Sequence, residues 1–270
     1  MGIGFGGRFS AITVSTLAFA TVCTSCLDNA PEARQASTPR PDAAPVVLRV
    51  CTTGDYKPMS SRDPATGRYL GVDIDIANDL AAHLRATAVF IATTWGTLMK
   101  DMAAPGKCDI AMGGISRTPA REQFADFTLP YLVSGKMPLT RYGNAERLQS
   151  IEQINRPGIR VIENSGGTNE EFARRNFPKA TLTIWPDNMT VFDQLLQDNA
   201  DVMITDAIEA LYQAKQHPEL VAGYSGKPFT VDYKAYMLPK GSPLIEQTNQ
   251  WLAEALTNGT FSRLLSKWLR

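Results

Sequence analysis

Two adjacent glutamates, Glu170 and Glu171, follow a pair of glycines in the stretch VIENSGGTNEEFARRNF, residues 161–177. A glutamic acid can protonate a leaving group, and it keeps its proton when burial or a nearby anion raises its pKa. The dipole of a helix also favours glutamate in the first turn without any chemistry. Glu170 is therefore either a general acid facing a closing cleft or a solvated residue of a first helical turn.

The three residues before these glutamates offer a second kind of chemistry. Backbone N–H groups at Gly166, Gly167 and Thr168, together with the dipole of a following helix, favour a bound anion. A tight turn is the plainer interpretation of two glycines. Thr168 could also cap the helix, with Glu171 three residues later completing a capping box.

Two further charged residues follow segments with the pattern of strands. Arg121, in SRTPAREQF, offers a fork of donors that matches a carboxylate, although a solvated helix position explains it equally well. Arg117 competes with it, and the spacing does not favour either one. Asp206 ends the apolar run ADVMITDA, where it could hold an ammonium group or cap the next helix.

The elements that must position these residues alternate along the chain. Apolar runs with turn residues at their ends predict strands within residues 47–54, 87–95, 108–116, 158–165, 180–186 and 200–206. Helical spacing predicts helices within residues 71–86, 96–104, 169–177, 189–198, 208–217, 242–257 and 260–270. Alternating strands and helices imply right-handed crossovers and mainly parallel sheets.

This order predicts an α/β protein of two lobes with a ligand cleft between them. The apolar alternation in FTVDYKAYMLPKG suits a strand that returns to the first lobe, so we expect residues 47–138 plus 235–270 in that lobe and 139–234 in the second. Ligands in such folds bind beyond the carboxyl ends of the strands. The expected ligand-binding residues are Asp55, Tyr56, Trp95, Gly114, Ser116, Arg121, Gly167, Thr168, Asn169 and Asp206.

The N-terminal segment has the features of an export signal. Residues 1–26 carry one early charge, Arg8, then an apolar run from Ala11 to Val22 and small residues, which is short for a transmembrane helix. Cys26 ends TSC, similar to the end of a lipoprotein box, so the alternatives are lipidation of Cys26 or simple cleavage. Residues 27–46, rich in proline and alanine, are predicted to be a disordered linker. We expect a periplasmic protein, with a lipid anchor to a membrane as the alternative to a free one.

The composition excludes several classes of function. The chain has 27 basic and 27 acidic residues, so a nucleic acid is a poor candidate partner, and a small molecule is expected instead. The two histidines, His83 and His217, lie near no nucleophile or ligand cluster, and neither phosphate-binding nor dinucleotide-binding glycine motifs are present. We therefore expect no metal and no cofactor. Cys51 and Cys108 are expected to be buried free thiols, with pairing in an exported protein as the alternative.

Four stretches together resemble a known family: LRVCTTGDYKP, GVDIDIANDLAAHL, CDIAMGGISRTPAREQFADFTLPY and ADVMITDA. They are similar to the periplasmic solute-binding proteins for polar amino acids, which have a type II two-lobed fold. This resemblance implies that Arg121 clamps a ligand α-carboxylate and that Asp206 holds its α-ammonium group. Tyr56 and Trp95 correspond to the aromatic residues of the family's ligand site.

A narrower resemblance concerns the stretches TTGDYKP, GGTNEEFAR, WPDNMTVFDQ, TDAIEA and HPEL, which occur here in that order. They resemble the cyclohexadienyl dehydratases, exported enzymes that share the binding-protein fold. The resemblance implies conversion of prephenate to phenylpyruvate or of arogenate to phenylalanine, with Glu170 as the general acid and no cofactor. The alternative is a non-catalytic protein that delivers an amino acid to a transporter. The sequence leaves the oligomeric state open.

Overall fold

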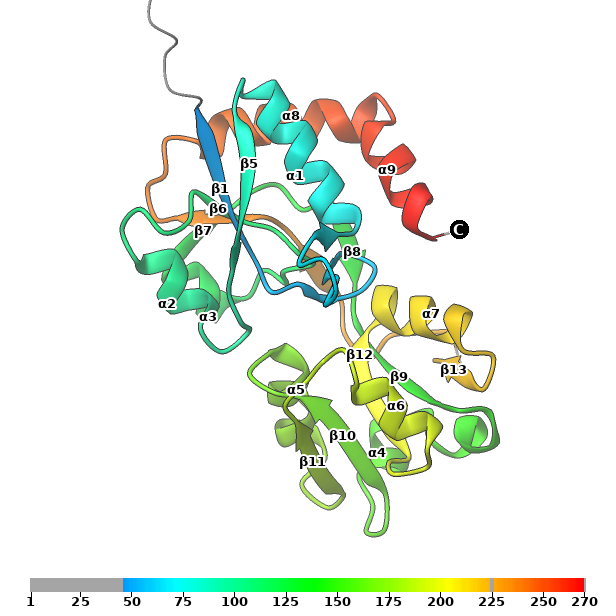
Figure 1. Ribbon diagram of the computed structural model, residues 1–270. Helices are drawn as coiled ribbons and strands as arrows, with labels where there is room; N and C mark the ends of the chain where they lie inside the picture. The colour runs from blue at the N-terminus through cyan, green and yellow to red at the C-terminus, as the bar shows by residue number, and fades with distance from the viewer. Residues whose placement is uncertain (1–45, 224–225, 270) are drawn as a thin grey trace, which may run out of the picture. The chain divides into compact units, whose positions relative to one another are not determined.

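A computed structural model describes residues 46–223 and 226–269 of the chain. The predicted signal segment with Cys26, and the linker apart from Val46, lie outside the described residues. Two five-stranded sheets organise the described part of the chain, and the first begins at Val47, as the sequence predicts (Figure 1).

The first sheet, in the first lobe, has the strand order β5-β1-β6-β15-β7. Strand β1 pairs in parallel with β5 and β6, whereas β15 runs antiparallel to β6 and β7. Its strands are β1 (Val47–Thr52), β5 (Thr87–Ala92), β6 (Ile110–Ala111), β7 (Ala125–Phe127) and β15 (Met237–Pro239). Strand β15 returns the chain to this sheet, and it lies in the segment whose apolar alternation suits such a strand.

The helices of the first lobe bury apolar side chains against this sheet and one another. Helix α1 presents Val72, Ile76 and Leu80 to a core that also takes in Trp251 and Phe261 from the two C-terminal helices. These helices are α1 (Val72–His83), α2 (Leu98–Ala103), α3 (Pro119–Glu122), α8 (Ile245–Thr257) and α9 (Thr260–Leu269). A small three-stranded sheet of β2 (Asp55–Tyr56), β3 (Ser60–Arg62) and β4 (Tyr69–Leu70) connects β1 to α1.

The second sheet, in the second lobe, has the order β11-β10-β12-β9-β13. Strand β10 pairs in parallel with β11 and β12, and β9 runs antiparallel to β12 and β13. Its strands are β9 (Lys136–Arg141), β10 (Arg160–Asn164), β11 (Thr181–Trp185), β12 (Val202–Asp206) and β13 (Leu220–Ala222). Its helices are α4 (Ile151–Ile154), α5 (Thr168–Asn176), α6 (Val191–Leu196) and α7 (Ala207–Gln216), with a 3₁₀ helix at Tyr142–Arg147.

Two antiparallel strands carry the chain between the sheets. Strands β8 (Leu132–Ser134) and β14 (Asp232–Lys234) pair with each other, and β8 leads into β9 while β14 leads into β15. Gly135 lies between β8 and β9, where a Cβ atom would come within 1.9 Å of the carbonyl oxygen of Thr230. Only glycine fits at this close approach of two backbones.

A disulfide joins Cys51 of β1 to Cys108, just before β6, with Cα atoms 5.6 Å apart. The expectation of free thiols is therefore wrong. The parallel pairing of β1 with β6 brings the two residues within bridging distance. Because they are 57 positions apart in the sequence, the sequence alone did not show that they are neighbours. The disulfide lies in the apolar core on the side of the sheet that α2 covers, just before the loops that carry Tyr56 and Ser116.

Candidate functional site

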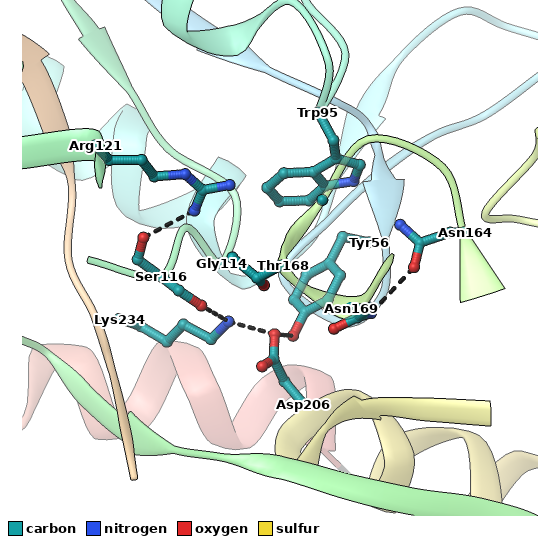
Figure 2. Close-up of a pocket in the computed structure, with 11 residues that line it drawn as sticks. Tyr56, Trp95, Gly114, Ser116, Arg121, Asn164, Thr168, Asn169, Asp206 and Lys234 are labelled. Atoms are coloured by element: carbon teal, nitrogen blue, oxygen red, sulfur yellow. Dashed lines mark hydrogen bonds and ion pairs between the residues drawn. The ribbon is translucent and has the colours of Figure 1, made fainter. Parts of the chain in front are cut away.

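A polar pocket lies where the strand ends and their loops meet. Its empty volume, which includes space open to solvent, is about 270 Å³. Figure 2 shows its lining: Tyr56, Trp95, Gly114, Ser116, Arg121, Asn164, Gly167, Thr168, Asn169, Asp206 and Lys234. The structure thus brings together all the predicted ligand-binding residues except Asp55, whose Oδ1 accepts a hydrogen bond at 3.1 Å from Nε1 of Trp95, a lining residue.

Asp206, the last residue of β12, is the buried anion of this pocket. Its Oδ1 accepts from Lys136 Nζ at 2.9 Å, and its Oδ2 accepts from Tyr56 Oη at 2.7 Å and from Lys234 Nζ. Burial opposes ionisation, but the charges of Lys136 and Lys234 overcome it and hold the pKa of Asp206 below its usual value. Both carboxylate oxygens are therefore already occupied by protein donors.

Lys136 and Lys234 are site residues that the sequence did not reveal. Lys136 Nζ also donates to Thr168 Oγ1 at 2.8 Å and to Asn169 Oδ1 at 2.5 Å, and Lys234 Nζ donates to Ser116 Oγ at 2.9 Å. Lysine is rarely buried without a partner, yet these side chains are only 4% and 1% exposed. A lysine inside an otherwise apolar strand pattern, as in GKMPLT and DYKAYM, is the signal that could have identified them.

Arg121 lies on the opposite wall of the pocket, in helix α3. Its Nη1 donates to the carbonyl of Ser116 at 2.8 Å, and its guanidinium carbon lies 5.9 Å from the centre of the Trp95 ring. Burial lowers its pKa, while the charges of Glu171 and Asp206 act in the other direction. Arg117, the competing candidate, is exposed and pairs with Glu122 on the surface, so the structure places Arg121 and not Arg117 in the pocket.

The glycine pair and the start of α5 form the side of the pocket that the second lobe provides. Gly167 is the N-cap of α5 and no side chain caps the helix, so the predicted capping box of Thr168 and Glu171 is wrong. The hydroxyl of Thr168 instead accepts from Lys136. Asn169 Nδ2 donates to Asn164 Oδ1 at 3.0 Å and to Thr205 Oγ1 at 3.2 Å, which fixes its amide beside the lysine.

The two glutamates of α5 have separate surroundings. Glu170 does not line the pocket: its Oε2 accepts from the backbone N–H of Gly166 at 2.7 Å, and its Oε1 accepts from Arg174 Nε at 2.8 Å. The Gly166 hydrogen bond and Arg174 outweigh partial burial and lower the pKa of Glu170, so the expected upward shift is not found in this arrangement. Glu171 lines an adjoining groove that shares Ser116 and Thr168 with the pocket.

Two fully buried glutamates support the pocket from the interior of the second lobe. Glu163 Oε1 accepts from the backbone N–H of Ile204 at 2.8 Å, and Glu209 Oε2 accepts from Thr205 Oγ1 at 2.5 Å. Each has a second carboxyl oxygen without a protein partner in the described part of the chain. Burial raises the pKa of both groups well above the usual value, which favours their protonated, neutral forms.

The charges at this site do not balance. Lys136, Lys234 and Arg121 bring three positive charges, and Asp206 is the ionised carboxylate that pairs with both lysines. A low-dielectric pocket with excess positive charge attracts anions, and a guanidinium fork suits a carboxylate. Within residues 46–223 and 226–269, no group of three or more side chains could hold a metal ion, and no helix has the length and hydropathy needed to cross a membrane.

Comparison with known proteins identifies the family to which this chain belongs. Residues 48–270 match the model of the bacterial extracellular solute-binding proteins, family 3. The cyclohexadienyl dehydratase of Pseudomonas aeruginosa is 46% identical over 223 residues, which are 83% of this chain and 82% of that enzyme. The L-cystine-binding protein of Escherichia coli K12 is 26% identical over 82% of each chain.

Solved structures show the same fold. The crystal structure of an ancestral amino-acid-binding protein, a precursor of cyclohexadienyl dehydratase, matches with a TM-score of 0.76 and 35% identity, covering 83% of this chain and 96% of that one. An ancestral cyclohexadienyl dehydratase matches with a TM-score of 0.51 and 50% identity over 83% of this chain and 92% of its own. The chain therefore belongs to family 3 of the bacterial extracellular solute-binding proteins and has their two-lobed α/β fold.

Proposed function

We propose that this protein is an exported cyclohexadienyl dehydratase, which converts prephenate to phenylpyruvate or arogenate to phenylalanine. The observation that carries the proposal is the set of three buried cations around a pocket whose ionised carboxylate, Asp206, is already paired. The 46% identity to a dehydratase over most of the chain supports the same assignment.

The hydrogen bonds that Asp206 already makes argue against a protein that only binds and delivers a free amino acid. An amino-acid site needs one cation for the α-carboxylate and a free anion for the α-ammonium group. Here both oxygens of Asp206 accept from lysines, so an incoming ammonium group would meet two cations before it met a free acceptor. Prephenate carries two carboxylates and no ammonium group, which suits Arg121 on one wall and the lysine cluster on the other, whereas the α-ammonium group of arogenate would meet the same two cations as that of a free amino acid.

The reaction requires the protein only to position the substrate and to donate one proton. The ring carboxylate leaves as CO₂, its bonding electrons form the aromatic ring, and the ring hydroxyl leaves as water after it accepts a proton. Because aromatisation drives the reaction, fixed charges that hold the carboxylates and one acid at the hydroxyl suffice. No electron acceptor is required, since the oxidation level changes only within the substrate.

Glu170 is the acid in this proposal. It directly follows Thr168 and Asn169, which line the pocket, and it lies in the GGTNE stretch that resembles the dehydratases. This role requires the side chain to leave Gly166 and Arg174 and to turn toward the substrate. The pocket lining itself offers Tyr56 and Lys234 as proton donors, and Lys136 lies beside it, but all three donate to Asp206.

Export and anchoring belong to the same proposal. The family is one of extracellular proteins, which supports a periplasmic location for this chain. If Cys26 carries a lipid, Cys26→Ser will move the protein from the membrane to the soluble fraction without changing its turnover. Equal membrane association of parent and Cys26→Ser would reject the anchor and leave simple cleavage.

Turnover and binding together test the function. Purified protein is incubated with prephenate while phenylpyruvate is followed by absorbance, and binding of a panel of free amino acids is measured by calorimetry. The proposal predicts catalytic formation of phenylpyruvate and no tight amino-acid complex. Tight binding of an amino acid without turnover of prephenate or arogenate would identify a transport protein instead.

A further inference from the structure

Asp73 is a fully buried carboxylate of the first lobe, and its hydrogen-bond partners come from three other segments of the chain. Its Oδ2 accepts from the backbone N–H of Gly114 at 2.6 Å and from the Tyr131 hydroxyl at 2.9 Å, and its Oδ1 accepts from the Tyr236 hydroxyl at 3.1 Å. Burial raises the pKa of Asp73 to about 6, while these hydrogen bonds act in the other direction. The ionised form is favoured above that pH, and hydrogen bonds to an ionised acceptor are the stronger kind.

The position of Asp73 in its own helix does not explain these contacts. Asp73 lies in the first turn of α1, where the helix dipole favours a carboxylate. That explanation is sufficient for Asp75, which is half-buried in the same turn and pairs with Lys267. No side chain caps α1, and within the described part of the chain the hydrogen bonds of Asp73 all go to residues outside the helix. Asp73 therefore joins separate segments to one another.

The first of these segments is the glycine turn after β6, which forms part of the pocket wall. Gly113 has a φ of +143° and Gly114 a φ of +72°, and two such glycines have little conformational preference of their own. A Cβ atom on Gly114 would lie 2.4 Å from Cε1 of Tyr56, so the Tyr56 ring packs directly on this turn. Because the Tyr56 hydroxyl donates to Asp206, a displaced turn would also displace that contact.

The same turn leads into Ser116, which holds two cations of the pocket. Its carbonyl accepts from Arg121 Nη1 at 2.8 Å, and its hydroxyl accepts from Lys234 Nζ at 2.9 Å (Figure 2). Ser116 also pairs with Lys234 in an antiparallel β-bridge, and the Arg117 N–H donates to the Tyr233 carbonyl at 2.9 Å. The pocket wall is thus bonded to β14, one of the two strands that connect the sheets.

The two tyrosines connect Asp73 to the same pair of strands. Tyr131 directly precedes β8, and Tyr236 is the second residue after β14. Their rings stack with centroids 4.5 Å apart, and the Tyr131 N–H donates to the Lys234 carbonyl at 2.9 Å. One carboxylate therefore binds the pocket wall and the first-lobe ends of both connecting strands.

We propose that Asp73 is a positioning residue for the pocket: it holds the turn of Gly114 and Ser116 against the first-lobe ends of β8 and β14. Asp73 does not line the pocket and acts only through these segments. Without it, the turn can shift, and with it the cations bonded to Ser116 and the Tyr56 ring packed on Gly114. The kinetic part of the proposal rests on the proposed function, because it assumes that prephenate reacts in this pocket.

Three variants at pH 8 separate positioning from plain stability. Asp73→Ala removes all three hydrogen bonds, so kcat for prephenate should fall about tenfold to a hundredfold and KM should rise. Asp73→Asn should keep both constants within about threefold of the parent, because its carbonyl can still accept from Gly114 and Tyr131 while its amide donates to Tyr236. Leu80→Ala is the control: it empties a buried position of the same helix away from the pocket, so it should lower the urea midpoint and leave kcat and KM near the parent values.

A double variant, Tyr131→Phe with Tyr236→Phe, keeps both rings in the core and so guards against an Asp73→Ala protein that does not fold. It removes the bonds from Asp73 to the connecting strands and leaves the one to Gly114. The proposal predicts that kcat falls about threefold or more. A folded double variant with the kcat of the parent would overturn the role of the strand contacts.

Proton–nitrogen NMR of substrate-free protein provides a readout that does not depend on turnover. An N–H held 2.6 Å from a carboxylate should resonate downfield and exchange slowly with solvent. Asp73→Ala should move the Gly114 amide signal upfield and speed its exchange, whereas Leu80→Ala should leave the signal in place.

Two results would overturn the proposal. One is a Gly114 signal that Asp73→Ala does not move. The other is an Asp73→Ala protein that is less stable, like Leu80→Ala, but has the kcat and KM of the parent, because that result indicates a purely structural role. A parent without turnover would reject the proposed function, while the Gly114 signal would still report whether Asp73 holds the turn.

Discussion

Gly166 of the second lobe lies against Gly96 of the first so closely that a Cβ atom on Gly166 would come within 2.9 Å of the Gly96 nitrogen. The two residues flank the pocket through their neighbours Gly167 and Trp95. A methyl group here would push the two loops apart, because a backbone atom cannot swing aside as a flexible side chain can. This contact between the two lobes helps to set the width of the pocket.

Gly166→Ala should lower kcat/KM for prephenate by about tenfold to a hundredfold, since small displacements of catalytic groups are costly. Gly158→Ala is the matched control, because Gly158 has a φ of +85°, near the +80° of Gly166, but a Cβ atom there would have no neighbouring atom within 4 Å. Both variants should lose about 1 kcal/mol of unfolding free energy through backbone strain. Equal kinetic losses in the two variants would show that the contact with Gly96 is irrelevant.

Asp206→Ala should reduce the free energy of unfolding by about 3–5 kcal/mol, because it leaves the buried Lys136 and Lys234 without their anion. Urea unfolding at pH 7 measures the change. Glu122→Ala is the control: it breaks the exposed pair with Arg117, and a loss below about 1 kcal/mol is expected. A loss for Asp206→Ala as small as that for Glu122→Ala would mean that the lysines do not depend on Asp206.

The disulfide should add about 4 kcal/mol to stability, as expected for a bond that closes a loop of 57 residues in the unfolded chain. Urea unfolding of the parent with and without a strong reductant measures this contribution. The double variant Cys51→Ala with Cys108→Ala should be less stable than the oxidised parent and should not respond to reductant. A parent whose unfolding midpoint ignores reductant, despite verified reduction of the bond, would contradict the prediction.

Glu209→Gln should stabilise the protein at pH 8 relative to the parent, with a smaller effect at pH 5. Burial raises the pKa of Glu209, so the folded protein holds a proton that the unfolded chain releases above its ordinary pKa of about 4.3. Stability from this group is therefore complete below that pH and declines as the pH rises toward the folded-state pKa. Glutamine mimics the neutral acid and removes the decline.

Urea unfolding across pH 5–8 provides the comparison, with the exposed Glu254→Gln as the control. The difference in unfolding free energy between Glu209→Gln and the parent should widen with pH, and that for Glu254→Gln should stay flat. A constant difference for Glu209→Gln would show that Glu209 is ionised in the folded protein.

Much of the fold could be predicted from the sequence, because apolar periodicity reports directly on which faces are buried. The alternation in the segment around Met237 located the strand that returns to the first sheet, and the spacing of Val72, Ile76 and Leu80 located α1. Strand ends then indicated the pocket, since Tyr56, Arg121 and Asp206 all follow or end apolar runs. These features depend on local patterns that a sequence displays.

What the sequence could not supply depends on contacts between distant segments. Lys136 and Lys234 are 98 positions apart along the chain, yet both bind Asp206, and lysine does not normally mark a buried site. The pairing of Cys51 with Cys108 depended on the order of strands in the sheet. The sequence also could not show where the Glu170 side chain points, because a glutamate on a helix can pair with a residue one turn away or face a pocket.

Glu170→Gln tests the account most directly, because glutamine keeps the shape of the side chain and removes its proton. The measurement is the steady-state rate of phenylpyruvate formation from prephenate by the parent and the variant at pH 7. We predict that kcat falls by about a hundredfold or more while KM changes little, as expected for the loss of a general acid. A kcat in Glu170→Gln equal to that of the parent would contradict the assignment of Glu170 as the acid.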